Sequence, residues 1–238
     1  MNSHRVPLLD VDGVLLDNQK WAVETARVIG DAAVPMLGGQ EEIWGTRHQH
    51  VWDSAWSRAN ETYKFDLGLR RINLSRWWDW VHADWIVQMC AEMGLQPPVS
   101  FEERVDTAEH IYHHVYTHAD IVFPGTREAI LDLDERFEIH TASGNPGWVV
   151  ETVLDRLGVR DRIGMPFGSD LADLQKGDDR FNPIILEAIG ADPTEVVLVD
   201  DRALVAARRH GITAVKMGTD GEGDLTISRL SDLSNLDV

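Results

Sequence analysis

The sequence predicts an α/β fold, a Rossmann-like doubly wound parallel sheet with an inserted α-helical segment. Three observations lead to this prediction. Short apolar runs alternate with helical patterns in the second half of the chain, which is typical of a parallel sheet covered by helices. No convincing strand occurs between residue 18 and about residue 120. Two of the apolar runs end in paired acids, and in open α/β sheets ligands bind beyond the carboxyl ends of the strands.

The first predicted element is a short buried strand that ends in two acids. Asp10 and Asp12 stand one residue apart at the end of an apolar run, and Gly13 follows at once, which allows a sharp turn. Residues i and i+2 of a strand point to the same side, so the two carboxylates are predicted to lie together. Carboxylates held that close repel each other unless a cation or a proton relieves them, and a hard divalent cation suits oxygen ligands. This stretch therefore predicts a magnesium site.

Residues 18–120 are the predicted helical insert. Eight of the nine tryptophans fall within residues 21–85, and buried aromatic rings dominate packing energy, so most of them are expected in the core of the insert. Trp77, Trp78 and Trp80 cannot share one helix face, so at least one is expected on a second packing surface, at a partner contact or in the cleft. One stripe at helical spacing consists of Leu74, Trp78, Val81, Trp85 and Met89.

The second half of the chain supplies the rest of the predicted sheet. Thr126 is the predicted N-cap of its first helix, and Gly158 and Gly190 follow the other two helices, where glycine commonly ends a helix. The predicted helices span residues 126–133, 148–157 and 183–189. The predicted strands are Phe137–Ala142, Val196–Val199 and Thr213–Met217.

Polar and charged side chains follow these strands or stand in adjoining loops. Ser143 and Gly144 come directly after the second strand, where a hydroxyl and backbone N–H groups can hold a phosphate oxygen. Lys176, one of only four lysines in the chain, stands in a loop before a helix. Asp200 and Asp201 follow the next strand. Strand ends of a parallel sheet share one edge, so all of these groups are expected in a single crevice.

The composition limits the partners. With 40 acidic and 22 basic residues the formal charge is −18, which disfavours a nucleic-acid partner because phosphate backbones are bound by Lys and Arg patches. Nothing approaches the roughly 18 consecutive apolar residues of a membrane-spanning helix, and the N-terminus carries no signal-peptide pattern. Cys90 is the only cysteine, which fits a reducing compartment. We expect a cytoplasmic enzyme with no membrane partner.

Taken in order along the chain, these motifs resemble those of the haloacid dehalogenase-like (HAD) hydrolase superfamily, whose members are mostly phosphatases. The resemblance covers residues 1–17 and about 120–217. It implies a catalytic core formed by residues 1–17 and 121–238 and a helical cap domain, residues 18–120, inserted after the first motif. The residues that carry it are Asp10, Asp12 and Gly13 for the first motif, Ser143 for the second, Lys176 for the third, and Asp200 with Asp201 for the fourth.

Two departures from the pattern of this superfamily are present. Gly177 follows Lys176 where many relatives have proline, which should not alter the chemistry. Leu204 and Val205 stand where many relatives have another acid, so the details of the fourth motif remain open.

The resemblance also implies a role for each residue. Asp10 would be the nucleophile that forms an aspartyl-phosphate. Asp12 would protonate the leaving oxygen and then activate the water that cleaves the intermediate. Lys176 and the Ser143 hydroxyl, with the Gly144 backbone, would hold the phosphate oxygens.

Magnesium is the implied cofactor. Its ligands would be the Asp10 carboxylate, the Asp12 backbone carbonyl and the acids of the fourth motif, Asp200 and Asp201. Alignment to the commoner Gly-Asp pattern favours Asp201 over Asp200 as the direct ligand.

The leading functional hypothesis is a magnesium-dependent phosphatase acting on a small phosphorylated metabolite. A phosphomutase would use the same Asp10 and Asp12 but would return the phosphoryl group to the substrate. A 2-haloacid dehalogenase also belongs to this resemblance, but those enzymes lack the second acid of the first motif, so Asp12 argues against it. A non-catalytic binding protein should have lost one of the motif residues, and none is missing.

Substrate-binding residues are expected in the insert. Arg47 and His48 precede a tryptophan and form a reasonable lining for an anionic, ring-bearing substrate. Arg70, Arg71 and Arg76 are equally good candidates. Exposed aromatic side chains in the insert would also allow a homodimer.

Overall fold

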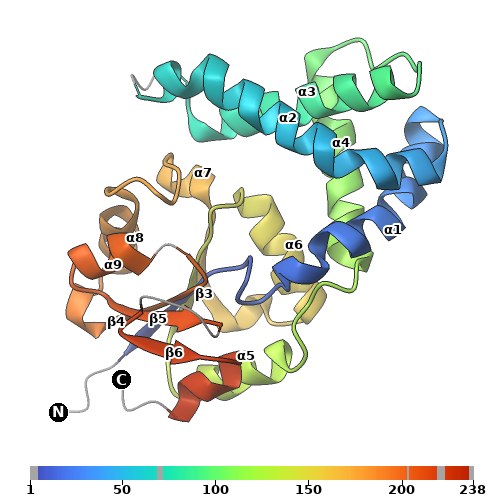
Figure 1. Ribbon diagram of the computed structural model, residues 1–238. Coiled ribbons are helices and arrows are strands. Elements are labelled where there is room, and N and C mark those ends of the chain that lie inside the picture. The colour runs from blue at the N-terminus through green and yellow to red at the C-terminus, as the bar shows by residue number, and fades with distance from the viewer. Residues whose placement is uncertain (1–4, 69–71, 203, 219–222, 236–238) are drawn as a thin grey trace. The chain divides into compact units, whose positions relative to one another are not determined.

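The chain folds into two compact units. The computed structural model describes residues 5–68, 72–202, 204–218 and 223–235. One unit, here called the sheet unit, comprises Met1–Asn18 and Val122–Val238, and the other, the helical unit, comprises Gln19–Ile121 (Figure 1). The limits predicted for the insert, 18–120, differ by one residue from those of the helical unit.

The described residues of the sheet unit form a six-stranded parallel sheet with the strand order β3-β2-β1-β4-β5-β6. This confirms the predicted α/β, doubly wound fold. Strand β4 is buried along its whole length, as expected for an apolar strand with neighbours on both sides. The strands are β1 (Val6–Leu9), β2 (Ile139–Ala142), β3 (Ile163–Phe167), β4 (Val196–Asp200), β5 (Thr213–Met217) and β6 (Leu225–Ile227).

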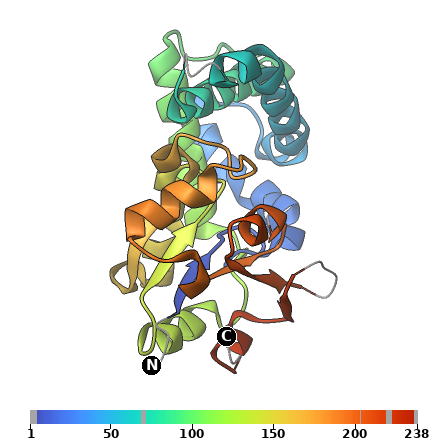
Figure 2. The same cartoon turned by 90° about the vertical axis from the view of Figure 1, so that its left-hand side faces the viewer.

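Helices cover both faces of this sheet. Figure 1 shows α8 and α9 on one side and α5 and α6 on the other, and α8 lies in front of the strands in Figure 2. Phe181 and Ile185 of α8 pack in one buried cluster with Leu8 and Leu198, which anchors this helix on β1 and β4. The helices are α5 (Thr126–Asp134), α6 (Gly147–Leu157), α7 (Ser169–Ala172), α8 (Phe181–Ile189) and α9 (Leu204–Arg209). Short 3-10 turns span Arg160–Arg162, Pro193–Glu195 and Leu230–Asn235.

The helix ends agree with the sequence in two cases and differ in one. Gly158 and Gly190 adopt left-handed conformations directly after α6 and α8, which only glycine does without strain. Thr126 was a wrong prediction for the N-cap of α5, because the cap residue is Gly125. The Thr126 hydroxyl instead donates a hydrogen bond to the Phe123 carbonyl, 2.8 Å away.

The helical unit contains the predicted insert, and its described residues form helices without a strand. Helix α4 begins with a capping box, in which Ser100 and Glu103 satisfy each other's backbone N–H groups. The helices are α1 (Asn18–Leu37), α2 (Glu41–Gly68), α3 (Leu74–Glu92) and α4 (Phe101–His118). Among the helices described, none combines the length and the apolar character needed to cross a bilayer.

Aromatic side chains fill the core of the helical unit. Every residue of the predicted stripe on α3 is buried, and the three clustered tryptophans divide between packing surfaces. Trp77 and Trp78 are buried and both contact Trp56, whereas Trp80 packs between Tyr63 and Phe101. Trp80 therefore lies on a second packing surface, which is one of the three places that the sequence left open.

Candidate active site

Strand register brings the predicted site residues to one edge of the sheet. Leu9, the last residue of β1, is paired with Val199 of β4 and with Thr141 of β2. The Asp10 N–H donates to the Val199 carbonyl at 3.0 Å, and the Ser143 N–H donates to the Phe167 carbonyl at 3.0 Å. Each residue is thus held by its neighbouring strand just beyond the carboxyl end of its own, where α/β sheets bind ligands.

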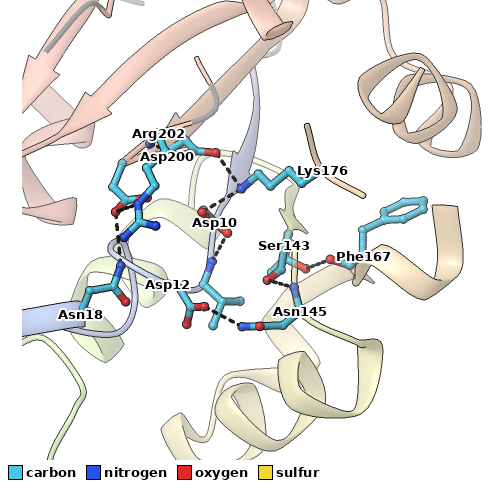
Figure 3. Close-up of polar contacts among 12 residues, drawn as sticks. Asp10, Asp12, Asn18, Ser143, Asn145, Phe167, Lys176, Asp200 and Arg202 are labelled. Atoms are coloured by element: carbon cyan, nitrogen blue, oxygen red, sulfur yellow. Dashed lines mark hydrogen bonds and ion pairs between the residues drawn. The ribbon is translucent and has the colours of Figure 1, made fainter. Parts of the chain in front are cut away.

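Lys176 joins two of these strand ends. Its Nζ lies 2.8 Å from Asp10 Oδ2 and 2.6 Å from Asp200 Oδ2 (Figure 3). The Lys176 side chain is about nine-tenths buried, and Asp10 and Asp200 are buried as well. The sequence placed Lys176 in a loop before a helix, and the structure shows that this loop, before α8, carries it to the ends of β1 and β4.

Burial controls the protonation of this group. Desolvation raises the pKa of Asp10 to about 7; Lys176 opposes the rise, and the acids Asp200 and Asp12 add to it. Burial alone would lower the pKa of Lys176, but its ion pairs with Asp10 and Asp200 outweigh burial and raise that pKa above its ordinary value. Lys176 therefore stays protonated. Asp10 has too little positive charge around it to offset its burial, which is why its pKa remains raised.

Three carboxylates form a candidate cation site. Oxygen atoms of Asp10, Asp200 and Asp201 all lie within 4.8 Å of one another. An oxygen-only donor set with excess negative charge is what a hard cation such as Mg²⁺ prefers, so these residues fit the implied metal. The Asp12 side chain lies outside this group, so a contribution of Asp12 to the metal would come from its backbone carbonyl.

The first motif is shaped by a turn and not by strand alternation. Strand β1 ends at Leu9, and Asp12 lies in a turn closed by hydrogen bonds to the Val11 carbonyl, so the two acids lie beyond the strand and not on it as predicted. Gly13 has a φ of +80°, and a Cβ built there would lie 2.5 Å from Asp201 Oδ2. Glycine is required at this position because both the backbone conformation and the nearby carboxylate exclude a side chain.

The turn directs Asp12 to the loop after β2. Asp12 Oδ2 accepts a hydrogen bond of 2.9 Å from the Asn145 side-chain amide (Figure 3). Burial raises the pKa of Asp12, and this hydrogen bond works against the rise. Ser143 and Gly144 precede Asn145 in the same loop; Ser143 is buried, and Gly144 lies beside the aliphatic chain of Lys176.

Four residues around the site were not singled out from the sequence. Asn145 contacts Asp12, as described above. Asn18 donates to Asp201 Oδ2 at 3.2 Å, Arg202 Nε lies 3.3 Å from the same oxygen, and Lys216 donates to the Asp201 carbonyl. None of these positions carries a local motif. Asn18, Asn145 and Lys216 each contact a residue that is distant in the sequence, and Arg202 directly follows Asp201.

The predicted substrate contacts lie in the helical unit. His48, on α2, is buried, and its Nδ1 is 3.0 Å from the Gly45 carbonyl. Burial lowers the pKa of His48. Arg47 is exposed and lies 3.8 Å from Glu92, and Arg76 stacks on the Phe101 ring. The remaining candidates, Arg70 and Arg71, lie outside the described residues.

Comparison with known proteins identifies the fold. No protein-family model matches the sequence, and no curated protein sequence matches it either. Solved structures do match over nearly the whole chain. The defluorinating L-2-haloacid dehalogenase Rha0230 aligns with a TM-score of 0.69 at 18% identity, covering 98% of this chain and 94% of that one.

Two further structures show the range of these matches. The L-2-haloacid dehalogenase from Xanthobacter autotrophicus, solved with chloropropionic acid covalently bound, aligns with a TM-score of 0.64 at 16% identity, covering 98% and 97% of the two chains. The HAD-hydrolase YfnB from Bacillus subtilis, solved bound to magnesium, aligns with a TM-score of 0.67 at 14% identity, with the same coverage. At these identities the likeness establishes a shared fold, and function must be argued from the site.

Proposed function

We propose that this chain, which has the fold of HAD-superfamily hydrolases, is a magnesium-dependent phosphatase that hydrolyses a phosphomonoester of a small metabolite. The observation that carries the proposal is the contact of Lys176 with both Asp10 and Asp200 beside a second acid, Asp12. In this proposal the sheet unit is the catalytic core, and the helical unit is the cap domain expected from the sequence.

In the proposed reaction Asp10 is the nucleophile and Asp12 is the general acid and base. An Asp10 carboxylate oxygen forms a bond to phosphorus while the bond from phosphorus to the ester oxygen breaks, which leaves an aspartyl-phosphate. Asp12 gives its proton to the departing oxygen and later takes a proton from the water that attacks the aspartyl-phosphate. Hydrolysis releases inorganic phosphate and restores both carboxyl groups to their starting states.

The cationic groups balance the charge of this reaction. Lys176, the Ser143 hydroxyl and the Gly144 backbone N–H would hold phosphate oxygens. Their positive charge and hydrogen bonds would offset the repulsion between the Asp10 carboxylate and the negatively charged phosphate. Asp10, Asp200 and Asp201 would hold the magnesium ion, with the Asp12 backbone carbonyl as a further ligand. When bound there, the ion supplies positive charge that offsets the charge on the phosphate oxygens.

Asp12 favours phosphoryl transfer over dehalogenation. A halide leaves carbon as a stable anion and needs no proton, whereas an alkoxide leaving from phosphorus needs an acid beside it. Dehalogenation would assign no role to the partly buried, hydrogen-bonded Asp12 carboxyl. Dehalogenases predominate among the matching structures, but at 14–18% identity those matches show a shared fold alone, so the Asp12 carboxyl carries more weight.

A paired assay separates these functions. Phosphate release is measured over a panel of sugar phosphates, nucleotides and small acid phosphates with magnesium or with EDTA, and halide release is measured from 2-chloropropionate. We expect magnesium-dependent phosphate release, its loss in Asp10→Asn with the fold intact by circular dichroism, and no halide release. Halide release without phosphate release would overturn the proposal, as would substantial turnover by Asp10→Asn.

A phosphomutase is the second candidate, since it would use the same two acids. It would convert one sugar phosphate into its isomer and depend on a bisphosphate activator. Release of inorganic phosphate in amounts equal to the substrate consumed supports the phosphatase.

A further inference from the structure

Asn145 makes a contact that the proposed reaction does not explain by itself. Its side-chain Nδ2 donates to Asp12 Oδ2 at 2.9 Å, from the loop after β2 to the turn after β1 (Figure 3). Among the residues that the structure describes, no other side chain donates a hydrogen bond to the Asp12 carboxylate. The orientation of Asp12 therefore depends on this one amide.

The backbone of Asn145 is fixed on both sides. Its N–H donates to Ser143 Oγ at 3.1 Å, and its carbonyl accepts from the Ser169 N–H at 2.8 Å and from the Ser169 hydroxyl at 3.3 Å. The Gly147 N–H donates to Asp170 Oδ1 at 2.7 Å. The segment from Asn145 to the start of α6 is thus held against the start of α7.

The backbones of these two segments also pack closely at Gly168, which directly precedes α7. A Cβ built on Gly168 would lie 2.8 Å from the Asn145 carbonyl oxygen and 2.7 Å from Gly147 Cα. Only glycine fits between these segments. The Asn145 amide is consequently presented from a rigid support, the condition under which a hydrogen bond can orient a reacting group at little entropic cost.

The contact also distinguishes the two oxygens of Asp12. An amide N–H can only donate, so Oδ2 is held as the acceptor. The proton of a protonated Asp12 would then sit on Oδ1, which is the oxygen left to exchange it with the substrate. A carboxyl group that rotates freely would offer its proton in the required direction for only part of the time.

We propose that Asn145 is a positioning residue, which holds Asp12 Oδ2 so that Oδ1 delivers the proton to the leaving oxygen. This inference rests on the proposed function, because it assigns a role in the same reaction. It implies that loss of Asn145 slows the reaction more when the leaving group is a stronger base and needs the proton more.

Two aryl phosphates of similar shape test that implication. Phenolate is a much stronger base than p-nitrophenolate, so phenyl phosphate needs the proton of Asp12 more than p-nitrophenyl phosphate does. The rate of the first chemical step is measured for both substrates from the burst of released phenol in rapid-mixing experiments. The variants are Asn145→Ala, which removes the donor, and Asn145→Asp, which keeps the side-chain volume but replaces the donor with an acceptor. Asn60→Ala, on α2 of the helical unit, is the control.

We expect both Asn145 variants to reduce the rate of the first chemical step about 10-fold more with phenyl phosphate than with p-nitrophenyl phosphate. This is a part of the factor typical of general acid catalysis. KM and magnesium affinity should stay within about twofold of wild type, because Asn145 lies outside the cation site. Asn60→Ala should leave this rate unchanged with both substrates.

Several results would overturn the inference. Equal losses on the two substrates would indicate a general structural role for the loop, and full activity in Asn145→Asp would show that volume alone matters. If the wild-type enzyme releases phosphate from neither substrate nor from any compound of the wider panel, the proposed function itself fails and the inference falls with it.

Discussion

Gly13 and Asp201 are in direct contact, because a Cβ built on Gly13 would lie 2.5 Å from Asp201 Oδ2. The turn after β1 and the acid after β4 can approach this closely only with glycine in the turn. Gly13→Ala should therefore displace Asp201 from the cation site and weaken magnesium binding, measured by calorimetry. It should also lower the free energy of unfolding by about 3 kcal/mol, through the positive φ and the overlap together.

Gly125→Ala is the matched control for Gly13→Ala. Gly125 has nearly the same φ, +81°, but a Cβ there would meet nothing within 4 Å. It should cost about 1 kcal/mol from the backbone conformation alone and leave magnesium binding unchanged. Equal losses of stability in the two variants would show that the Gly13–Asp201 approach has no energetic consequence.

Replacement of Lys176 should expose the charge imbalance of the site. Lys176→Met leaves Asp10 and Asp200 buried without their cation, so the unfolding free energy without magnesium should fall by about 3 kcal/mol. Magnesium should then restore more stability to the variant than it adds to wild type, because the ion supplies the missing positive charge. The measurement is chemical denaturation with and without magnesium.

Lys20→Met provides the same chemical change at an exposed ion pair. Lys20 lies 3.4 Å from Asp120, and both side chains are exposed, so its loss should change the stability little. If Lys176→Met proves equally harmless without magnesium, the buried ion pairs do not contribute as described.

Asp200 and Asp201 should respond differently to removal of their charge. Asp200 is buried, contacts Lys176 and accepts a 2.6 Å hydrogen bond from the Arg202 N–H, so Asp200→Asn should destabilise the protein even without metal. Asp201 is partly exposed, so Asp201→Asn should weaken magnesium binding by about 10-fold or more with little effect on the stability of the metal-free protein. Identical effects of the two substitutions in calorimetry and denaturation would contradict this division.

The helical unit should lose stability in acid because of His82. Its ring is buried among those of Trp52, Trp78 and Tyr112, and burial lowers its pKa from 6.5 to about 3. Between these two values the unfolded chain binds a proton at His82 and the folded unit does not. The full stability of the folded unit is therefore present above pH 6.5 and is lost as the pH falls toward 3. At pH 5 the loss should be about 2 kcal/mol.

Tryptophan emission can follow this transition, because eight of the nine tryptophans lie in the helical unit. His82→Phe should reduce the acid-induced loss without abolishing it, since burial lowers the pKa of His48 as well. His113→Phe, at an exposed position of α4, should leave the pH dependence of stability unchanged. A wild-type slope in His82→Phe would place the acid sensitivity elsewhere.

The sequence was most informative where a strand is buried and least informative at the edges of the sheet. Strands β4 and β5 were predicted to within a residue because most of their residues are apolar and buried. Strands β3 and β6 were not predicted: β3 contains Gly164 and Pro166, which read as breaks, and β6 has only three residues. Both are edge strands, which have a neighbour on one side only and so need less apolar sequence.

The candidate site followed the same pattern. Asp10, Lys176 and Asp200 were predictable because each adjoins a strand end or loop that the sequence marks. Asn145 was not, because its support comes from Ser169, which follows the unpredicted strand β3. Arg47 and His48 illustrate another limit, since nothing in a helical sequence states which polar side chain is buried and which is exposed.

The missed strand β3 also determines where the sheet stops. The Phe167 carbonyl is bonded to β2, and backbone groups of successive residues in a strand face opposite sides, so Pro166 stands where an outward-facing N–H would otherwise be. Proline cannot donate that hydrogen bond, and the opposite edge offers only the three residues of β6. Neither edge is a good template for adding a strand from another chain. The sheet is thereby protected from the edge-to-edge association that leads to aggregation.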